Sequence, residues 1–264
     1  LKTKETRQLL FYAPDLLNPF YMEVYHGMED YAEEHGYTIV VSRHYEHSMV
    51  SQRQFDGVVL SNLCREEQEG YLKLGVPVVV TSYTNQSLEI PSVGIDIEEG
   101  ACKLMDFLME HGHNHIAFMS QVTSDNDQRY RGYMESMRRK GKTIRPEWVV
   151  TGAAGANAYE QGYKAALKLL ESRTPVTAIF AFNDAMAIGA IAALHSRDLR
   201  VPEHVSVAGF DDILQSRYTC PPLSTVYMPK YEQGVESARM LIKAINGEKV
   251  EALTLKTRLV LRQS

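Results

Sequence analysis

Polar side chains that could bind a ligand recur in one kind of position along this chain, at or just after the carboxyl end of an apolar run that predicts a buried strand. These side chains are Asp15, Asp96, Arg129, Asn183 and Asp211. In open α/β sheets, ligands bind in the crevice outside the carboxyl ends of the strands. Carboxylates, a guanidinium and an amide together supply the donors and acceptors that clasp a polyhydroxylated small molecule. The spacing therefore predicts a cleft that binds such a molecule.

The same residues also fit purely structural roles. Asn183 follows the apolar run 178–182 and precedes an Ala-rich helical stretch, so it is a favoured N-cap. Asp96 and Asp211 could cap helices in the same way. Arg129 could be a surface charge at the start of its helix. The residues alone leave both interpretations open.

Two adjacent aromatic residues near the N-terminus extend the possible site. Asn18 and Pro19 predict a helix start, and Phe20 and Tyr21 follow directly. Their rings could form the aromatic wall against which sugar rings or flat bases pack, although tyrosines at helical spacing also belong in cores.

Motifs of the common enzyme classes are absent from the sequence. It contains no G-x-S-x-G, no G-x-x-x-x-G-K-[ST], and no G-x-G-x-x-G after the first expected strand. The alternate histidines His111, His113 and His115 span a helix end and a strand start, where His complements the helix dipole. An enzyme with Asp96 and Asp211 as acid and base would still need a nucleophile, metal or cofactor site. We expect no catalysis, no metal and no cofactor.

The composition is that of an ordinary water-soluble globular protein. The chain has 264 residues, 44% of them hydrophobic and 23% charged, with a formal net charge of −5. This charge argues against nucleic-acid binding by its own surface. No apolar run is long enough to span a membrane, and residues 1–14 lack a signal-peptide pattern. Three widely spaced cysteines fit a reducing compartment, so we expect a cytoplasmic protein.

Strand and helix patterns alternate through two consecutive series of similar length. Expected strands of the first series cover residues 9–12, 38–41, 56–60, 76–80 and 92–95, and those of the second cover 115–120, 148–151, 177–182 and 205–210. Expected helices cover residues 18–36, 66–74, 100–111, 129–140, 159–172, 184–194 and 230–245, and two further strands cover 224–227 and 254–261. The pattern predicts an α/β fold with two doubly wound parallel-sheet lobes and a tail that crosses back between them.

Eight short motifs, in register along nearly the whole chain, resemble those of the lactose-repressor/galactose-repressor family of bacterial transcription regulators. They are NPFY at 18–21, FDGVV at 55–59, GHNHIA at 112–117, RYRGY at 129–133, TAIFAFND at 177–184 with Ala187 and Gly189, GFDD at 209–212, PPLSTV at 221–226 and LVLRQS at 259–264.

The resemblance implies two lobes of the periplasmic-binding-protein type, joined by three crossings, with a small-molecule effector bound between them. The implied lobes comprise residues 7–110 with 228–249 and residues 111–226 with 250–264. The implied effector contacts are Phe20, Tyr21, Asp96, Arg129, Asn183 and Asp211. Members of the family are usually homodimers whose affinity for operator DNA changes with effector.

Three features depart from the family pattern. The helix-turn-helix headpiece that would contact operator DNA is absent from this chain, and the segment 42–55 is shorter than the family's usual second helix region. Five residues before Gly162, where several relatives place a stacking aromatic, this chain has Asn157, which we include among the expected effector contacts.

The expected function is therefore the effector-sensing and dimerisation domain of a transcription regulator of the repressor type, responding to a sugar or related metabolite. The alternative is a periplasmic solute-binding protein of a sugar transporter.

Overall fold

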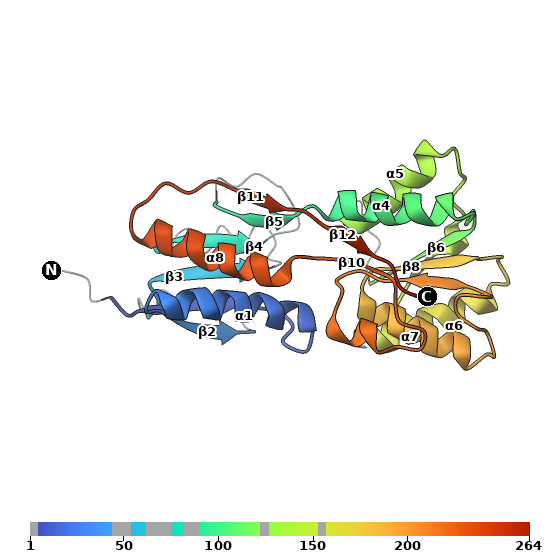
Figure 1. Cartoon of the computed structure of the whole chain (residues 1–264), viewed down its shortest axis with the longest axis horizontal. Coiled ribbons are helices and arrows are strands. Elements are labelled where there is room, and N and C mark those ends of the chain that lie inside the picture. The colour runs from blue at the N-terminus through green and yellow to red at the C-terminus, as the bar shows by residue number, and fades with distance from the viewer. Residues whose placement is uncertain (1–4, 44–53, 62–74, 82–89, 122–126, 153–156) are drawn as a thin grey trace. The chain divides into compact units, whose positions relative to one another are not determined.

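The structure is a computed structural model, and it describes residues 5–43, 54–61, 75–81, 90–121, 127–152 and 157–264. The chain forms two compact units, each made from two stretches of sequence (Figure 1). Unit 1 comprises Leu1–Asp96 and Pro229–Lys256, and unit 2 comprises Ile97–Met228 and Thr257–Ser264. The chain passes between the units three times, as the resemblance implies.

Unit 1 is built on a four-stranded parallel sheet with the order β2-β1-β3-β4. The strands are β1 (Gln8–Tyr12), β2 (Thr38–Ser42), β3 (Gly57–Ser61) and β4 (Val78–Thr81). All residues of β3 and β4 are buried, as expected for apolar runs in a parallel sheet. A smaller parallel pair joins β5 (Val93–Ile95) to β11 (Leu253–Leu255).

Two helices from opposite ends of the sequence pack together in unit 1. They are α1 (Pro19–Glu34) and α8 (Lys230–Ile245), which lie side by side (Figure 1). Asn18 caps α1 as predicted, because its side chain accepts a hydrogen bond from the Phe20 amide at 3.0 Å.

Unit 2 repeats the strand order of unit 1. Its parallel sheet runs β7-β6-β8-β9, which is again second, first, third, fourth in chain order. The strands are β6 (Ile116–Ser120), β7 (Val149–Thr151), β8 (Ala178–Ala181) and β9 (Ser206–Ala208), and β10 (Thr225–Tyr227) pairs antiparallel with β12 (Arg258–Val260). The helices are α4 (Ile97–Glu110), α5 (Gln128–Arg139), α6 (Ala158–Glu171) and α7 (Asp184–His195), with short 3₁₀ turns η1 (Pro146–Trp148) and η2 (Leu214–Arg217).

Glycines allow the principal helix pairs to approach to backbone contact. A Cβ added at Gly27 of α1 would lie 2.0 Å from the Tyr231 carbonyl oxygen of α8, and one at Gly234 would lie 2.0 Å from that of Val24. In unit 2, Gly162 of α6 and Gly189 of α7 likewise leave no room for a Cβ, because each lies against a backbone carbonyl oxygen of the opposing helix. Each unit therefore has a helix pair in which both partners need a residue without a side chain.

Two predictions differ from the structure. The expected strand 254–261 is two strands, β11 in unit 1 and β12 in unit 2, because the chain crosses between the units after Lys256. The expected lobe boundary at residue 110 also differs, since α4 belongs to unit 2. There α4 packs on α5, with Arg139 bonded to Asp106 at 2.5 Å.

Some predictions concern residues that the structure does not describe. The expected helix 66–74 lies outside the described residues, and so does most of the segment 42–55. None of the helices in the described part of the chain combines the length and hydropathy needed to cross a bilayer.

Candidate functional site

The carboxyl ends of the unit 2 strands bring together the predicted Arg129 and Asp211. Arg129 lies at the start of α5, which follows β6, and Asp211 follows β9. The Arg129 Nη2 atom donates a hydrogen bond to Asp211 Oδ1 at 3.3 Å, and the two side chains are only 6% and 5% exposed. Arg129 is therefore not a surface charge. Burying this pair is costly, because desolvation offsets much of the attraction between the charges. Such a costly pair is a candidate for a functional role.

Two phenylalanines and a methionine hold the Arg129 guanidinium in place. Its carbon lies 4.3 Å from the ring centroid of Phe182 and 4.7 Å from that of Phe210, in cation–π geometry. The Met228 sulfur lies 3.7 Å from Nη2. Apolar neighbours on several sides fix the direction of the fork donors.

The backbone at Asp211 and Asp212 is strained. Their φ angles are +114° and +54°, in a region that residues with a Cβ rarely adopt. The strained turn is held by β10, because the Asp211 amide donates to the Val226 carbonyl at 2.9 Å and the Met228 amide donates to the Asp211 carbonyl at 3.4 Å. Strain of this kind persists only when the surroundings over-determine it, and it gathers at ligand-binding positions.

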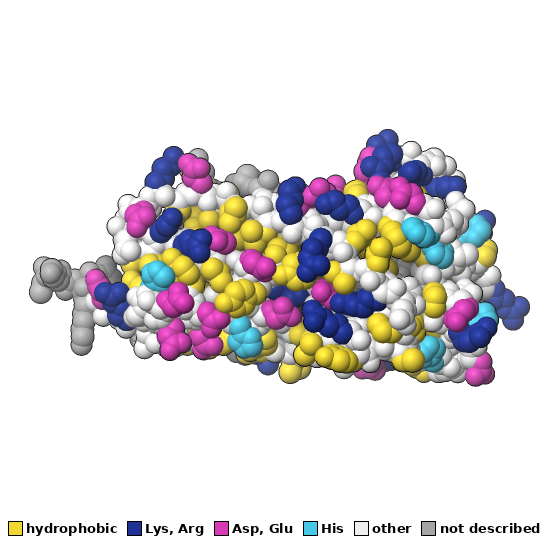
Figure 2. All heavy atoms as spheres, in the orientation of Figure 1, with side chains coloured by type: hydrophobic (Ala, Val, Ile, Leu, Met, Phe, Trp, Pro, Cys, Tyr) yellow, Lys and Arg dark blue, Asp and Glu magenta, His cyan; other side chains and the backbone are white. Residues whose placement is uncertain are grey.

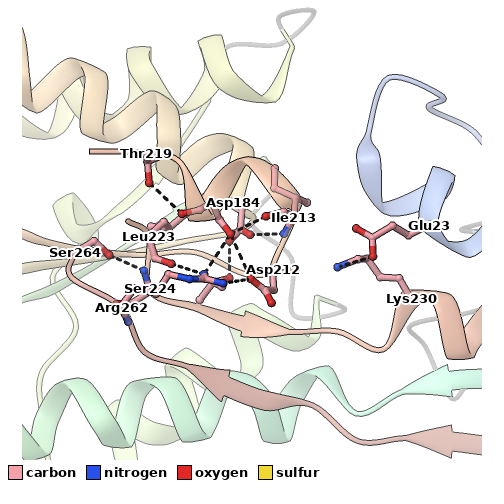
Figure 3. A network of polar contacts seen from close by, with 12 residues as sticks. Glu23, Asp184, Asp212, Ile213, Thr219, Leu223, Ser224, Lys230, Arg262 and Ser264 are labelled. Atoms are coloured by element: carbon pink, nitrogen blue, oxygen red, sulfur yellow. Dashed lines mark hydrogen bonds and ion pairs between the residues drawn. The ribbon is translucent and has the colours of Figure 1, made fainter. Parts of the chain in front are cut away.

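A buried ionic network supports this turn from beneath (Figure 3). Arg262, near the C-terminal end of the described chain, donates from Nη2 to Asp212 Oδ1 at 2.6 Å and from Nη1 to the Leu223 carbonyl at 2.6 Å. The Ser264 hydroxyl accepts from the Ser224 amide at 2.7 Å. Three separate segments of chain thus meet under the GFDD motif.

Asp184 anchors the same turn from α7. Its Oδ2 atom accepts from the Ile213 amide at 2.8 Å, and its Oδ1 atom accepts from the Thr225 hydroxyl at 2.5 Å. The Asp184 amide in turn donates to the Phe210 carbonyl at 2.8 Å. The Asn-Asp dipeptide after β8 is therefore tied directly to the Asp-Asp dipeptide after β9.

Asn183 and Asn157 both serve as helix caps. Asn183 is buried, and its Oδ1 accepts from the Met186 amide at 2.9 Å, which confirms the predicted cap of α7. Asn157 is exposed and caps α6 through the Glu160 amide at 3.0 Å. Both lie beyond the carboxyl ends of strands, so their effector contacts stay predictions alongside the capping role.

The predicted residues of unit 1 lie in two places. Phe20 and Tyr21 are buried at the start of α1, with their rings edge to face at a centroid distance of 5.3 Å. The Asp96 Oδ2 atom is 2.8 Å from Nζ of Lys256. This ion pair joins two of the three segments in which the chain crosses between the units. Phe20 and Tyr21 thus belong to the core of unit 1, and Asp96 already has a cationic partner.

The histidine run has structural partners. Nδ1 of His111 donates to the Phe107 carbonyl at 2.8 Å, and Nδ1 of His113 lies 3.1 Å from the Thr177 hydroxyl. Burial, and then the neighbouring His111, lower the pKa of His113. In the described part of the chain, no group of three or more His, Cys, Asp or Glu is placed to hold a metal ion.

The residues that support the site were not among the predicted site residues. Phe182, Phe210, Asp184, Asp212 and Arg262 all lie inside the motifs named above, but each was assigned to a strand, a cap or an unexplained motif position. The available signal was the second residue of each dipeptide, an aspartate in both Asn183-Asp184 and Asp211-Asp212, whose carboxylate can anchor the turn.

Two units of identical strand order, with polar residues at the carboxyl edge of the sheet, define a domain of the periplasmic-binding-protein type. A family model described as a periplasmic binding protein-like domain matches residues 105–264.

Comparison with individual proteins specifies the family. The chain is 32% identical to catabolite control protein A of Priestia megaterium, over all of this chain and 83% of that protein. It is 30% identical to the transcriptional repressor CytR of Escherichia coli K12, over 95% of this chain and 76% of that protein. The chain belongs to the lactose-repressor/galactose-repressor, or LacI, family of transcription regulators.

Solved structures agree with this placement. The complex of the transcriptional regulator CelR with cellobiose matches with a TM-score of 0.87 and 28% identity, over all of this chain and 86% of that one. The transcription regulator CcpA of Lactococcus lactis matches with a TM-score of 0.86 and 25% identity, over 97% of this chain and 98% of that one.

Proposed function

We propose that this chain is the effector-sensing and dimerisation domain of a bacterial transcription repressor, and that it binds a sugar or a related small metabolite. The effector changes the affinity of an attached DNA-binding headpiece for its operator. Relatives named as repressors and a neighbour solved with cellobiose support this role. They favour it over the periplasmic solute-binding protein, and over an enzyme. Because operator DNA lies in the bacterial cytoplasm, this role also places the protein there.

The observation that carries the proposal is the buried Arg129–Asp211 pair on a strained turn. Both side chains are buried away from solvent. Phe182 and Phe210 fix the position of the Arg129 guanidinium, and the strained turn at Asp211 and Asp212 fixes that of the carboxylate. A fork donor beside a carboxylate is suited to adjacent hydroxyls of a sugar. The position of the effector between the two lobes stays a prediction from the family resemblance.

Effector binding provides the mechanism of regulation. A ligand shifts an equilibrium between arrangements only when it binds one of them better. The three crossings between the two compact units are the segments that we propose act as the hinge for such a change.

A thermal-shift screen over sugars, sugar phosphates and nucleosides, followed by calorimetry, tests the proposal. Replacing Arg129 with methionine should weaken binding of the identified effector at least about tenfold, because a buried charged contact is lost. The control is Arg138→Met, which removes an exposed arginine from the same helix. Equal affinity of the Arg129 and Arg138 variants would defeat the assignment.

Dimerisation is proposed through an apolar surface of unit 2. Leu214 of η2 is 59% exposed and Tyr218, at the C-terminal cap of η2, is 80% exposed, so two large side chains of one short segment face solvent. Leu214→Asp combined with Tyr218→Asp should convert the dimer to a monomer, because it places charges where the partner would pack. Sedimentation equilibrium measures this, with Leu253→Asp of β11 as the control. A dimer that survives the double replacement would refute this surface.

A further inference from the structure

Helix α5 carries two apolar side chains outside its buried face. The helix turns Arg129, Tyr133 and Met137 into the interior of unit 2, where all three are buried. Tyr130 and Met134 lie one turn apart on a different side of the helix, and both are partly exposed. The solvent side of an amphipathic helix is ordinarily polar. Two large apolar side chains at this spacing therefore call for an explanation.

These two side chains line a pocket on unit 2. Its volume is about 610 Å³, and Ile144, which follows the end of α5, is a third apolar residue in its lining. Helix α4, which packs on α5 (Figure 1), contributes Glu98 from its first turn. Pockets that bind small molecules have volumes of about 300–1,000 Å³ and combine apolar side chains with a few polar groups. The pocket therefore has the size of a small-molecule site.

One of the cations that line the pocket has no partner within the described part of the chain. Arg131 forms an ion pair with Glu98 at 2.8 Å. Arg138 forms one with Glu135, also at 2.8 Å. Lys142 is exposed, and its side chain makes no ion pair or hydrogen bond with any described residue. Three cations and two carboxylates line the pocket, so its charge favours an anion.

The helix dipole offers a simpler reason for a lysine at this place. Cations near a helix C-terminus are stabilised by the dipole, and both Lys140 and Lys142 follow the last residue of α5. Only Lys142 of the two lines the pocket. The two lysines thus share the dipole but differ in their access to the pocket, which makes Lys140 a matched control.

From this geometry we propose that unit 2 has a second small-molecule site on α5, which binds an organic anion whose aromatic body carries one carboxylate. The body packs against Tyr130, Met134 and Ile144, and the carboxylate pairs with the Lys142 ammonium. None of the residues that line this pocket is among the predicted effector contacts, so the site is additional to the candidate effector site.

The extent of the lining favours a small molecule over a protein partner. Eight described residues line the pocket, whereas a standard protein interface involves about 20–30 residues on each side. A protein segment is therefore the competing occupant that the experiment has to exclude.

Matched carboxylates and amides test the site by calorimetry on the whole chain. The probes are benzoate with benzamide, phenylacetate with phenylacetamide, indole-3-acetate with indole-3-acetamide, and acetate alone. In at least one pair, the carboxylate should bind at least about tenfold more tightly than the amide, because only the carboxylate forms an ion pair with the lysine. Acetate should bind at least about tenfold more weakly than that carboxylate, because it lacks the body that packs in the pocket.

Three variants locate the binding. Lys142→Met keeps an apolar stem and should lower the affinity for the carboxylate to that for the amide. Met134→Glu places a charge in the apolar lining and should weaken both members of the pair at least about tenfold. Lys140→Met removes an exposed lysine outside the pocket and should leave both affinities unchanged. Circular dichroism checks that each variant is folded.

Four outcomes would overturn the inference. Equal effects of Lys142→Met and Lys140→Met would show that general surface charge attracts the anion. A loss in Arg129→Met as large as that in Lys142→Met would assign the carboxylate to the candidate effector site. A helical peptide of Glu and Leu that binds while no carboxylate does would make a protein segment the occupant. If none of the probes binds, the second site is refuted, and the proposed function, which rests on Arg129 and Asp211, still stands.

Discussion

Replacing Arg262 with methionine is expected to lower the free energy of unfolding by about 3–5 kcal/mol, the cost of removing one partner of a buried ion pair. The Asp212 side chain is 3% exposed and that of Arg262 is 15% exposed, with 2.6 Å between Oδ1 and Nη2. The variant retains an apolar stem but leaves the carboxylate buried without this guanidinium. It also removes the donor of the Leu223 carbonyl.

Urea unfolding followed by circular dichroism measures this difference. The control is Arg138→Met, since Arg138 forms an exposed pair with Glu135 three residues away on α5. Exposed pairs of this kind contribute about 0–1 kcal/mol. Similar losses in the two variants would show that the network beneath the GFDD turn does not stabilise unit 2.

Replacing Gly162 with alanine is expected to cost about 3 kcal/mol, the upper end of the range for overpacking a well-packed interior. The new methyl carbon would lie 2.0 Å from the Met186 carbonyl oxygen and 2.6 Å from its Cα, all atoms of the α7 backbone. The helices must therefore separate. In an exposed helix, the same change would stabilise by about 0.5–1 kcal/mol, so the sign of the effect is informative.

Gly132 of α5 provides a graded comparison. A Cβ there would lie 2.6 Å from the Ala101 methyl of α4 and 2.9 Å from the Glu98 carbonyl oxygen. Gly132→Ala should cost less than Gly162→Ala, and adding Ala101→Gly should restore part of the loss. Thermal unfolding of the three variants measures both effects. A stabilised Gly162→Ala variant would contradict the close packing of α6 and α7.

Local patterns predicted most of the elements correctly, for physical reasons visible in single segments. Runs such as 58–60 and 178–181 are apolar throughout, as strands covered on both faces must be. Asn18 and Asn183 are helix caps that a short stretch of sequence specifies by itself. These elements depend on neighbours along the chain, so the sequence is sufficient to find them.

The network around Arg262 could not be predicted in this way. It joins α7, the turn after β9 and the end of β12, which are far apart in sequence, and only the fold brings them together. The split of the expected strand 254–261 has the same origin, because β11 and β12 pair with strands of different units. Burial of Arg129 depends likewise on Phe182 and Phe210 from two other strand ends.

The face of the molecule shown in Figure 2 carries charges of both signs. On the face shown in Figure 2, Lys and Arg side chains are interspersed with Asp and Glu and do not form a continuous patch of one sign. A single-sign stripe is the usual mark of a nucleic-acid-binding surface. This face agrees with the sequence-based expectation that operator contacts belong to a separate headpiece.

The division of each unit into two stretches of sequence has a consequence for synthesis on the ribosome. Helix α8 and strand β11 of unit 1 come from residues 229–256, and the arginine that balances Asp212 in unit 2 comes from residues 257–264. Nascent chains emerge from the N-terminus, and domains with contiguous sequences can fold as they appear. Here unit 1 is incomplete until residues 229–256 have been made, and unit 2 is incomplete until residues 257–264 have been made. Until residues 229–256 have been made, the apolar face of α1 lacks α8, the helix that packs against it.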